Sequence, residues 1–188
     1  MAVLPIRISG DPVLHQRTQE VTDFGPALHE LIADMFDTME EAPGVGLAAP
    51  QVGVGLRLFV FNWVDDDDLL WRGAAINPRL LITPTPIGEA DDETESEGCL
   101  SIPGERYPLR RSERAVLTAL DAAQKGFEVD ATGWLARIFQ HEYDHLNGVL
   151  YADRLDELHS FELAKVVRKR KWGVPGRSWI PGVDDIEA

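Results

Sequence analysis

The segment with the clearest chemical meaning is Q-H-E-Y-D-H at residues 140–145, which contains an H-E-x-x-H pattern. In a helix, His141 and His145 lie one turn apart on the same face, so both imidazoles can bind one metal ion. Glu142 lies beside this pair and can take a proton from a water on the metal. The segment therefore predicts a hydrolytic metal site. The structural alternative is a helix whose two histidines are hydrogen-bonded at the edge of the core.

The H-E-x-x-H pattern does not identify the third metal ligand by itself. One class of proteases extends it to H-E-x-x-H-x-x-G-x-x-H. This chain follows the extension as far as Gly148 but has Tyr151 where the third histidine would stand. A later glutamate, Glu157 or Glu162, would give a site of two histidines and one glutamate. Both glutamates lie in a charge-rich stretch, which indicates a solvated helix face rather than a metal site.

The only cysteine of the chain, Cys99, is the better candidate for the third ligand. A lone cysteine is usually a small buried hydrophobe. Here it stands between Gly98 and Leu100, just before the turn-forming residues 102–104, where a chain reversal can direct the side chain into a cleft. Two histidines and a cysteine leave a fourth position for water, which is typical of a catalytic site. Zinc, iron(II), cobalt and nickel are all compatible with these ligands.

A second segment of possible functional importance contains glycines and reads G-V-G-L-A-A-P-Q at residues 44–51. One interpretation is a turn after a helix that ends near Ala42. Glycines also let a backbone approach a ligand closely, and the segment continues into apolar residues. We therefore expect Gly44, Val45 and Gly46 to form an edge segment that pairs its main chain with a bound peptide. A phosphate-binding loop is excluded because the Gly-Lys-Ser/Thr ending is absent.

Three segments in this order resemble the peptide deformylase family. Residues 44–51 match its G-x-G-x-A-A-x-Q signature, residues 97–101 match E-G-C-L-S, and residues 140–145 match Q-H-E-x-D-H. The likeness runs from about residue 8 to about residue 155. It implies a metal-dependent hydrolase that removes the N-formyl group from the N-terminal formylmethionine of nascent polypeptides and releases formate. It also implies iron(II) as the native metal, which zinc, nickel or cobalt can replace.

The resemblance assigns roles to individual residues. It gives the metal ligands as Cys99, His141 and His145, and the general base and acid as Glu142. Gln51 and the backbone N–H of Leu100 become the donors that polarise the formyl carbonyl. An amide side chain does not titrate in the working range, so Gln51 suits this role as a fixed dipole and not as an acid or base.

Four charged residues receive supporting roles. The resemblance places Arg106 at the mouth of the site and pairs Glu97 with Arg111. Asp144 either orients a neighbouring side chain of the site or forms an ion pair with an unrelated arginine.

Length and composition indicate one globular domain with a core, since the chain has 188 residues of which 44% are hydrophobic. We expect a catalytic domain over residues 1–171 and a C-terminal tail of unknown role over residues 172–188. A single cysteine suits a reducing cytosol, and the N-terminus lacks the pattern of a secretory signal. The longest apolar stretch, residues 56–64, is too short to span a membrane. These features predict a cytoplasmic protein that binds no membrane.

The net charge of −14 argues against DNA binding. Five of the seven residues from Lys165 to Lys171 are nevertheless basic. Besides formylated nascent peptides as substrates, the resemblance implies docking on the ribosome through this C-terminal helix, where cations would suit RNA. The alternative is that these cations complement the dipole of the helix C-terminus.

The pattern of apolar and turn residues predicts the elements that position these groups. We expect helices at 26–42, 132–147 and after 153, strands at 57–63, 74–82, 114–121 and 126–130, and a short helical turn opened by Asp11-Pro12. Asn77-Pro78 is expected to break the second strand, and the acidic stretches 65–68 and 89–97 to be solvated loops. Strands grouped apart from helices indicate an α+β fold, with antiparallel sheets packed around the central motif helix.

Overall fold

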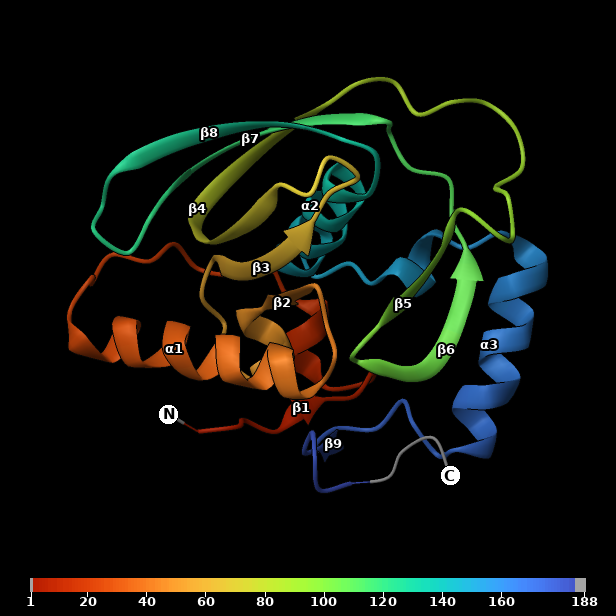
Figure 1. The fold of residues 1–188 in the computed structure, drawn as a ribbon. Coiled ribbons are helices and arrows are strands. Elements are labelled where there is room, and N and C mark those ends of the chain that lie inside the picture. Colours follow the sequence, from red (N-terminus) through yellow and green to blue (C-terminus); the bar gives the residue numbers. More distant parts are fainter. Residues whose placement is uncertain (1, 185–188) are drawn as a thin grey trace.

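The computed structural model describes residues 2–184, which form one five-stranded sheet, two small two-stranded sheets and three α-helices (Figure 1). The main sheet is antiparallel throughout and has the order β2-β3-β4-β7-β8. Its strands are β2 (Gly46–Ala48), β3 (Leu58–Val64), β4 (Leu70–Ile82), β7 (Arg114–Leu120) and β8 (Gly126–Thr132). The predicted α+β class with antiparallel sheets is confirmed.

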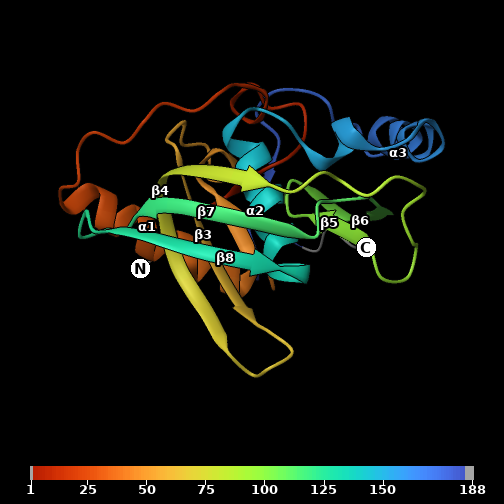
Figure 2. The same cartoon turned by 90° about the horizontal axis from the view of Figure 1, so that it is seen from above.

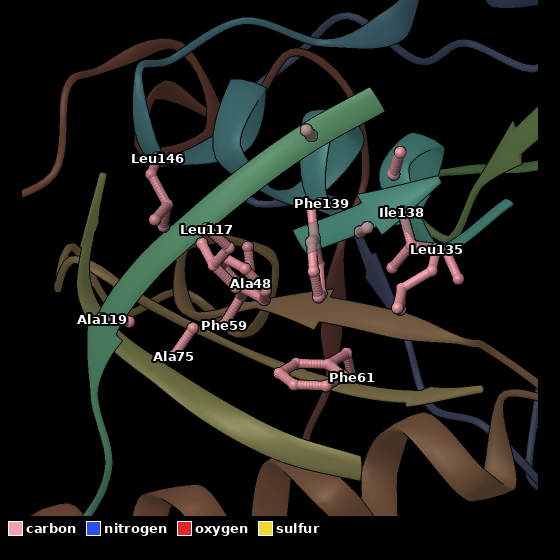
Figure 3. Close-up of a cluster of buried hydrophobic side chains, with 13 residues drawn as sticks. Ala48, Phe59, Phe61, Ala75, Leu117, Ala119, Leu135, Ile138, Phe139 and Leu146 are labelled. Atoms are coloured by element: carbon pink, nitrogen blue, oxygen red, sulfur yellow. The ribbon is translucent and has the colours of Figure 1, made fainter. Parts of the chain in front are cut away.

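The motif helix α2 (Gly133–Leu146) lies against one face of the main sheet and is buried along most of its length. Phe139 of this helix meets Phe59 and Phe61 of β3, with ring centroids 6.1 and 5.1 Å apart (Figure 3). Burying each such ring contributes about 2–3 kcal/mol. The helix that carries the metal-binding pattern is therefore held firmly on the sheet.

The opposite face of the sheet is covered by α1 (Pro26–Glu41). Successive side chains of a strand point to opposite faces. Accordingly, Leu58 and Val60 pack with α1, whereas Phe59 and Phe61 pack with α2. The main sheet is thus enclosed between two helices, which explains why β3 is apolar on both sides.

A separate hairpin beside α2 is formed by β5 (Ser96–Cys99) and β6 (Ile102–Pro108) (Figure 2). The turn between its strands follows Cys99 directly. The last helix, α3 (Glu157–Lys169), lies at the outside of this hairpin, and Leu163 is its buried residue (Figure 1). Within residues 2–184, no helix has both the length and the apolar character needed to cross a membrane.

The third sheet joins segments from near the two ends of the described chain. In it, β1 (Ile6–Arg7) pairs antiparallel with β9 (Ser178–Trp179). Ile6 and Trp179 form a small buried cluster with Ile8 and Ala42. The beginning of the expected tail therefore packs on the rest of the protein, while residues 185–188 of that tail lie outside the described part. The boundary at residue 171 remains a prediction.

Most of the expected elements are confirmed within a few residues, but the second strand was predicted wrongly. It begins at Leu70 and continues through Asn77-Pro78. Asn77 adopts a φ of 51°, and its side chain bonds the backbone N–H and C=O of Val21 at 2.8 and 2.9 Å. These two hydrogen bonds hold a bulge in β4, so the Asn-Pro pair bends the strand and does not end it.

The second acidic stretch was also predicted wrongly at its C-terminal end. The residues from 89 onward begin as an exposed loop, but Ser96 and Glu97 belong to β5, and Glu97 is 3% exposed. A carboxylate buried to this extent must be paired. Its partners lie at the site described next.

Candidate metal centre

Two histidines of α2 and the last residue of β5 meet in the interior. The rings of His141 and His145 lie one helical turn apart, with centroids separated by 5.0 Å. Sγ of Cys99 lies 3.3 Å from Nε2 of His145, and the ligand atoms of the three residues all lie within 4.8 Å of one another. The structure thus brings together the three residues that the sequence indicated as metal ligands.

These three side chains fit a tetrahedral metal ion. Bonds of about 2.0–2.3 Å separate the ligand atoms of such an ion by about 3.5 Å, close to the observed sulfur–nitrogen distance. Burial lowers the pKa of His145 well below its usual value, so this ring is neutral and can donate a lone pair. Burial also opposes the charge on His141, but Cys99 and Glu97 raise its pKa well above the usual value. A cation between these side chains would replace that proton.

Glu97 fixes the orientation of His141. Nδ1 of His141 lies 3.2 Å from Oε1 of Glu97 and donates to it, which leaves Nε2 for a metal. Arg111 donates to the same carboxylate at 2.6 and 3.2 Å, and Arg137 at 3.1 Å. Burial would raise the pKa of Glu97, but the hydrogen bond from His141 and the charge of Arg111 hold it well below its usual range. The expected pairing of Glu97 with Arg111 is confirmed.

Asp144 extends this network by one step. Its carboxylate accepts hydrogen bonds of 2.6 Å from Arg111 and of 2.6 and 2.7 Å from Arg154. The two interpretations of Asp144 therefore coincide. It pairs with arginines, and through Arg111 it supports the carboxylate that orients His141.

Replacing Arg111, the cation at the centre of this ion-pair network, should destabilise the protein strongly. In Arg111→Met, Glu97 and Asp144 each lose a buried partner, and the free energy of unfolding is expected to fall by about 3 kcal/mol. Urea denaturation measures this change. The matched control is Arg114→Met, whose exposed pair with Asp130 should be worth less than about 1 kcal/mol. Equal losses in the two variants would contradict a special role for the buried pair.

The next residue of the motif helix, Glu142, is 4% exposed and lies beside the ligands. Its Oε2 atom has no hydrogen-bond partner among residues 2–184. Burial raises the pKa of Glu142 to about 7, although the positive charge of His141 opposes this shift. A carboxylate that titrates near neutrality is well suited to accept and return a proton.

Gly44 and Gly46 leave the space that two site residues occupy. A Cβ on Gly46 would overlap the carboxylate of Glu142, and one on Gly44 would lie 2.9 Å from Cδ1 of Leu100. Gly46 also begins β2, the edge strand of the main sheet, as expected for a segment that could pair with a peptide. This steric role was not predictable from local sequence, because Glu142 and Leu100 are distant from the two glycines along the chain.

Gln51 directs its amide nitrogen toward Cys99, one of the three predicted metal ligands. Its Nε2 lies 3.6 Å from Sγ of Cys99 and 3.4 Å from Oγ of Ser101. Its Oε1 accepts a 2.8 Å hydrogen bond from the backbone N–H of Ala48, which fixes which end of the amide faces the site. The side chain is 1% exposed and therefore forms a preorganised donor.

A cavity of about 800 Å³ opens onto these groups. The residues that the sequence predicted as metal-binding, catalytic or substrate-binding line it, with the exception of His145. Arg106 is exposed and lines the cavity as expected, with its guanidinium donating a 3.1 Å hydrogen bond to the carbonyl of Ser96. Val45 is 39% exposed at the same rim.

The other ligands considered from sequence are placed differently. Tyr151 stacks on the ring of His141 at 6.1 Å and donates to the carbonyl of Glu105. It therefore packs against His141, a predicted metal ligand, at the position where the protease pattern would have a third histidine. Glu157 and Glu162 are exposed on α3 and belong to no cluster with the two histidines.

Sequence reasoning missed several residues around the cavity. Arg137 stands one helical turn before His141, so its proximity could have been inferred from spacing. Three tryptophans also line the cavity, Trp63, Trp134 and Trp179. They come from β3, α2 and β9, and no local pattern relates these positions.

Comparison with known proteins agrees with this geometry. The family model described as polypeptide deformylase matches residues 3–161. A peptide deformylase of Tropheryma whipplei (strain TW08/27) is 50% identical over 190 residues, covering 95% of this chain and 94% of the relative. One of Mycolicibacterium paratuberculosis is 50% identical over 189 residues, covering 97% and 96%.

Solved structures of peptide deformylases are also similar to this chain. A peptide deformylase of Ehrlichia chaffeensis in complex with actinonin matches with a TM-score of 0.78 and 34% identity, covering 91% of this chain and 99% of that one. A peptide deformylase of Legionella pneumophila matches with a TM-score of 0.77 and 38% identity, covering 90% and 96%.

Proposed function

The chain belongs to the polypeptide deformylase family, and we propose that it removes the N-formyl group of nascent peptides with Glu142 as base beside a metal held by Cys99, His141 and His145. Members of this family are metal-dependent hydrolases that act on N-terminal formylmethionine. The observation that supports the residue assignment is a cluster of three possible ligand atoms beside the buried carboxylate of Glu142, whose Oε2 has no hydrogen-bond partner within residues 2–184, at one cavity.

We assign the proton transfers of the reaction to Glu142. When bound, the metal supplies a Lewis acid that polarises the formyl carbonyl and lowers the pKa of the attacking water. The carboxylate of Glu142 accepts a proton from that water and later delivers it to the nitrogen of the leaving amine. Its raised pKa favours both directions of transfer near neutral pH.

Two uncharged donors stabilise the oxygen on which negative charge develops. We assign this role to Nε2 of Gln51 and to the backbone N–H of Leu100. Gln51 is supported by its distance of 3.6 Å from Cys99 and by the hydrogen bond that fixes its amide. Losing one donor of this kind typically costs about 10²–10³-fold in turnover.

The peptide part of the substrate is proposed to pair with the segment from Gly44 to Gly46. β2 is an edge strand whose outer side is not covered by another strand of the main sheet, so its main chain can add a bound peptide. Main-chain pairing requires no particular side chain, which would let one enzyme accept many residues after formylmethionine. Arg106 is assigned to the mouth of the same cavity.

Gly46→Ala tests the close approach between this segment and the base. The added methyl group should displace the carboxylate of Glu142, and a shift of about 1 Å in a catalytic group can lower turnover about a hundredfold. Release of formate from formyl-Met-Ala is the measurement. Gly126→Ala is the matched control, because a Cβ at that strand position meets nothing within 4 Å. Wild-type turnover of Gly46→Ala would contradict the steric role.

We propose iron(II) as the native metal, with zinc, nickel or cobalt able to replace it. One thiolate and two imidazoles accept all four ions, so the identity must be measured. Anaerobic purification followed by metal analysis and assay of formate release should give about one iron per chain and high activity. Exposure to air should abolish that activity, since a thiolate beside iron(II) is readily oxidised. Zinc as the only metal under anaerobic conditions would contradict the proposal.

We further propose a cytoplasmic location and docking on the ribosome through α3. Support comes from the basic C-terminal end of that exposed helix, where Arg168 and Lys169 lie in the last turn. Charge reversal of both residues should reduce cosedimentation with ribosomes at low salt. Lys125→Glu, at the tip of the β7–β8 hairpin, is the matched control. Unchanged cosedimentation of the double variant would leave the cations with the simpler role of complementing the helix dipole.

A further inference from the structure

The segment that follows α3 returns to the catalytic cavity. It leads into β9, which pairs with β1, and it contributes Trp179, Gly182 and Asp184 to the cavity lining. Gly182 packs directly against the carboxylate of Glu41 at the end of α1, where a Cβ would overlap it. The segment is thus fitted against the cavity wall.

Within this segment, Trp179 contacts the turn that follows Cys99. Its indole Nε1 donates a 2.9 Å hydrogen bond to the backbone carbonyl of Leu100, and its residue is 7% exposed. The ring also belongs to a buried cluster with Ile6 and Ala42, against which Leu100 packs. An indole N–H buried here needs an acceptor, and the acceptor is the residue whose own N–H is assigned to the reaction.

The carbonyl of the next residue, Ser101, is held by the segment that follows β1. The backbone N–H of Ser9 donates a 2.8 Å hydrogen bond to the carbonyl of Ser101. The carbonyls of Leu100 and Ser101 are therefore both anchored, one by each of the segments that form the β1–β9 sheet region. The N–H of Leu100 belongs to the peptide that precedes these anchored carbonyls, directly after Cys99, so the two hydrogen bonds restrain its direction through the φ and ψ angles of Leu100.

We propose that Trp179 is a positioning residue for the deformylation reaction, holding the Leu100 turn so that its N–H faces the reacting carbonyl. The inference rests on the proposed role of Leu100. A preorganised donor stabilises developing charge without reorganising at the moment of reaction, and a turn of two residues needs external restraints to be preorganised. The strand β9, which carries Trp179, would then support the reaction by positioning one of its donors.

Trp179→Phe tests this proposal because it keeps an aromatic ring in the cluster and removes only the indole donor. Loss of one hydrogen bond that holds the donor should lower kcat about three- to tenfold, with KM for formyl-Met-Ala and the metal content within about twofold of wild type. Hydrogen exchange of the peptide containing residues 98–102 should become faster. Trp172→Phe is the control, since Trp172 packs beside the same cluster and should leave kcat and this exchange unchanged.

Three results would overturn the proposal. They are wild-type kcat in Trp179→Phe, unchanged exchange at residues 98–102, and a loss of kcat that merely follows a loss of bound metal or folded protein. Failure of the proposed function is distinguishable, because the wild-type protein itself would then release no formate.

Discussion

Glu142→Ala is expected to keep its metal and to lose at least about a thousandfold in turnover. The side chain is not one of the three clustered ligands, so its removal should leave the ion bound. The variant lacks the buried carboxylate whose pKa is raised to about 7, which is the group proposed to take the proton from water and return it to the amine. Formate release from formyl-Met-Ala and metal content per chain are the two measurements.

Two further variants make the result on Glu142 specific. Glu142→Gln keeps the size of the side chain and removes only its ability to accept a proton, so it should be nearly as inactive as the alanine variant. Glu128→Ala removes an exposed carboxylate from β8 and should retain full activity. Substantial activity in the glutamine variant would remove Glu142 as the base, and loss of metal from either variant would indicate a structural role.

The second large effect is expected for Cys99→Ser. The hydroxyl group is nearly isosteric but does not ionise at neutral pH, so the ion loses its only anionic protein ligand. We expect the affinity for metal to fall at least about a hundredfold, beyond the 10–100-fold typical of residues that only orient a ligand. Competition with a chelator measures the affinity.

Cobalt(II) provides an independent test of the same residue. The wild-type protein loaded with cobalt should show a charge-transfer absorption from thiolate to metal, and Cys99→Ser should lack it. Because Cys99 is the only cysteine, no other side chain can supply this band. Unchanged metal content together with an unchanged spectrum would exclude the cysteine as a ligand.

The parts of the site that were predictable from sequence depend on local spacing. His141, Glu142 and His145 lie within two turns of one helix, so their relative positions follow from the helical repeat. Cys99 could be inferred because it precedes a chain reversal. The α+β fold followed from the grouping of the strands, and α2 begins and ends close to the predicted residues.

The parts that were not predictable depend on contacts between distant segments. Glu97 looked like the end of a solvated acidic loop, but it is buried because Arg111, Arg137 and His141 surround its carboxylate. Gly46 looked like part of a turn or a peptide contact, yet its side facing Glu142 has no room for a methyl group. Asn77-Pro78 looked like a break within the strand, whereas the strand continues through a bulge that side-chain bonds to Val21 hold.

The pairing of Ile6 with Trp179 has a consequence for how each new copy of the enzyme matures. Translation proceeds from the N-terminus, so β1 must wait for more than 170 further residues to be synthesised before its partner strand exists. A growing copy whose synthesis has not yet passed residue 179 cannot form the bond from Trp179 to Leu100. The formyl group on that growing copy is therefore expected to be removed by an enzyme molecule completed earlier.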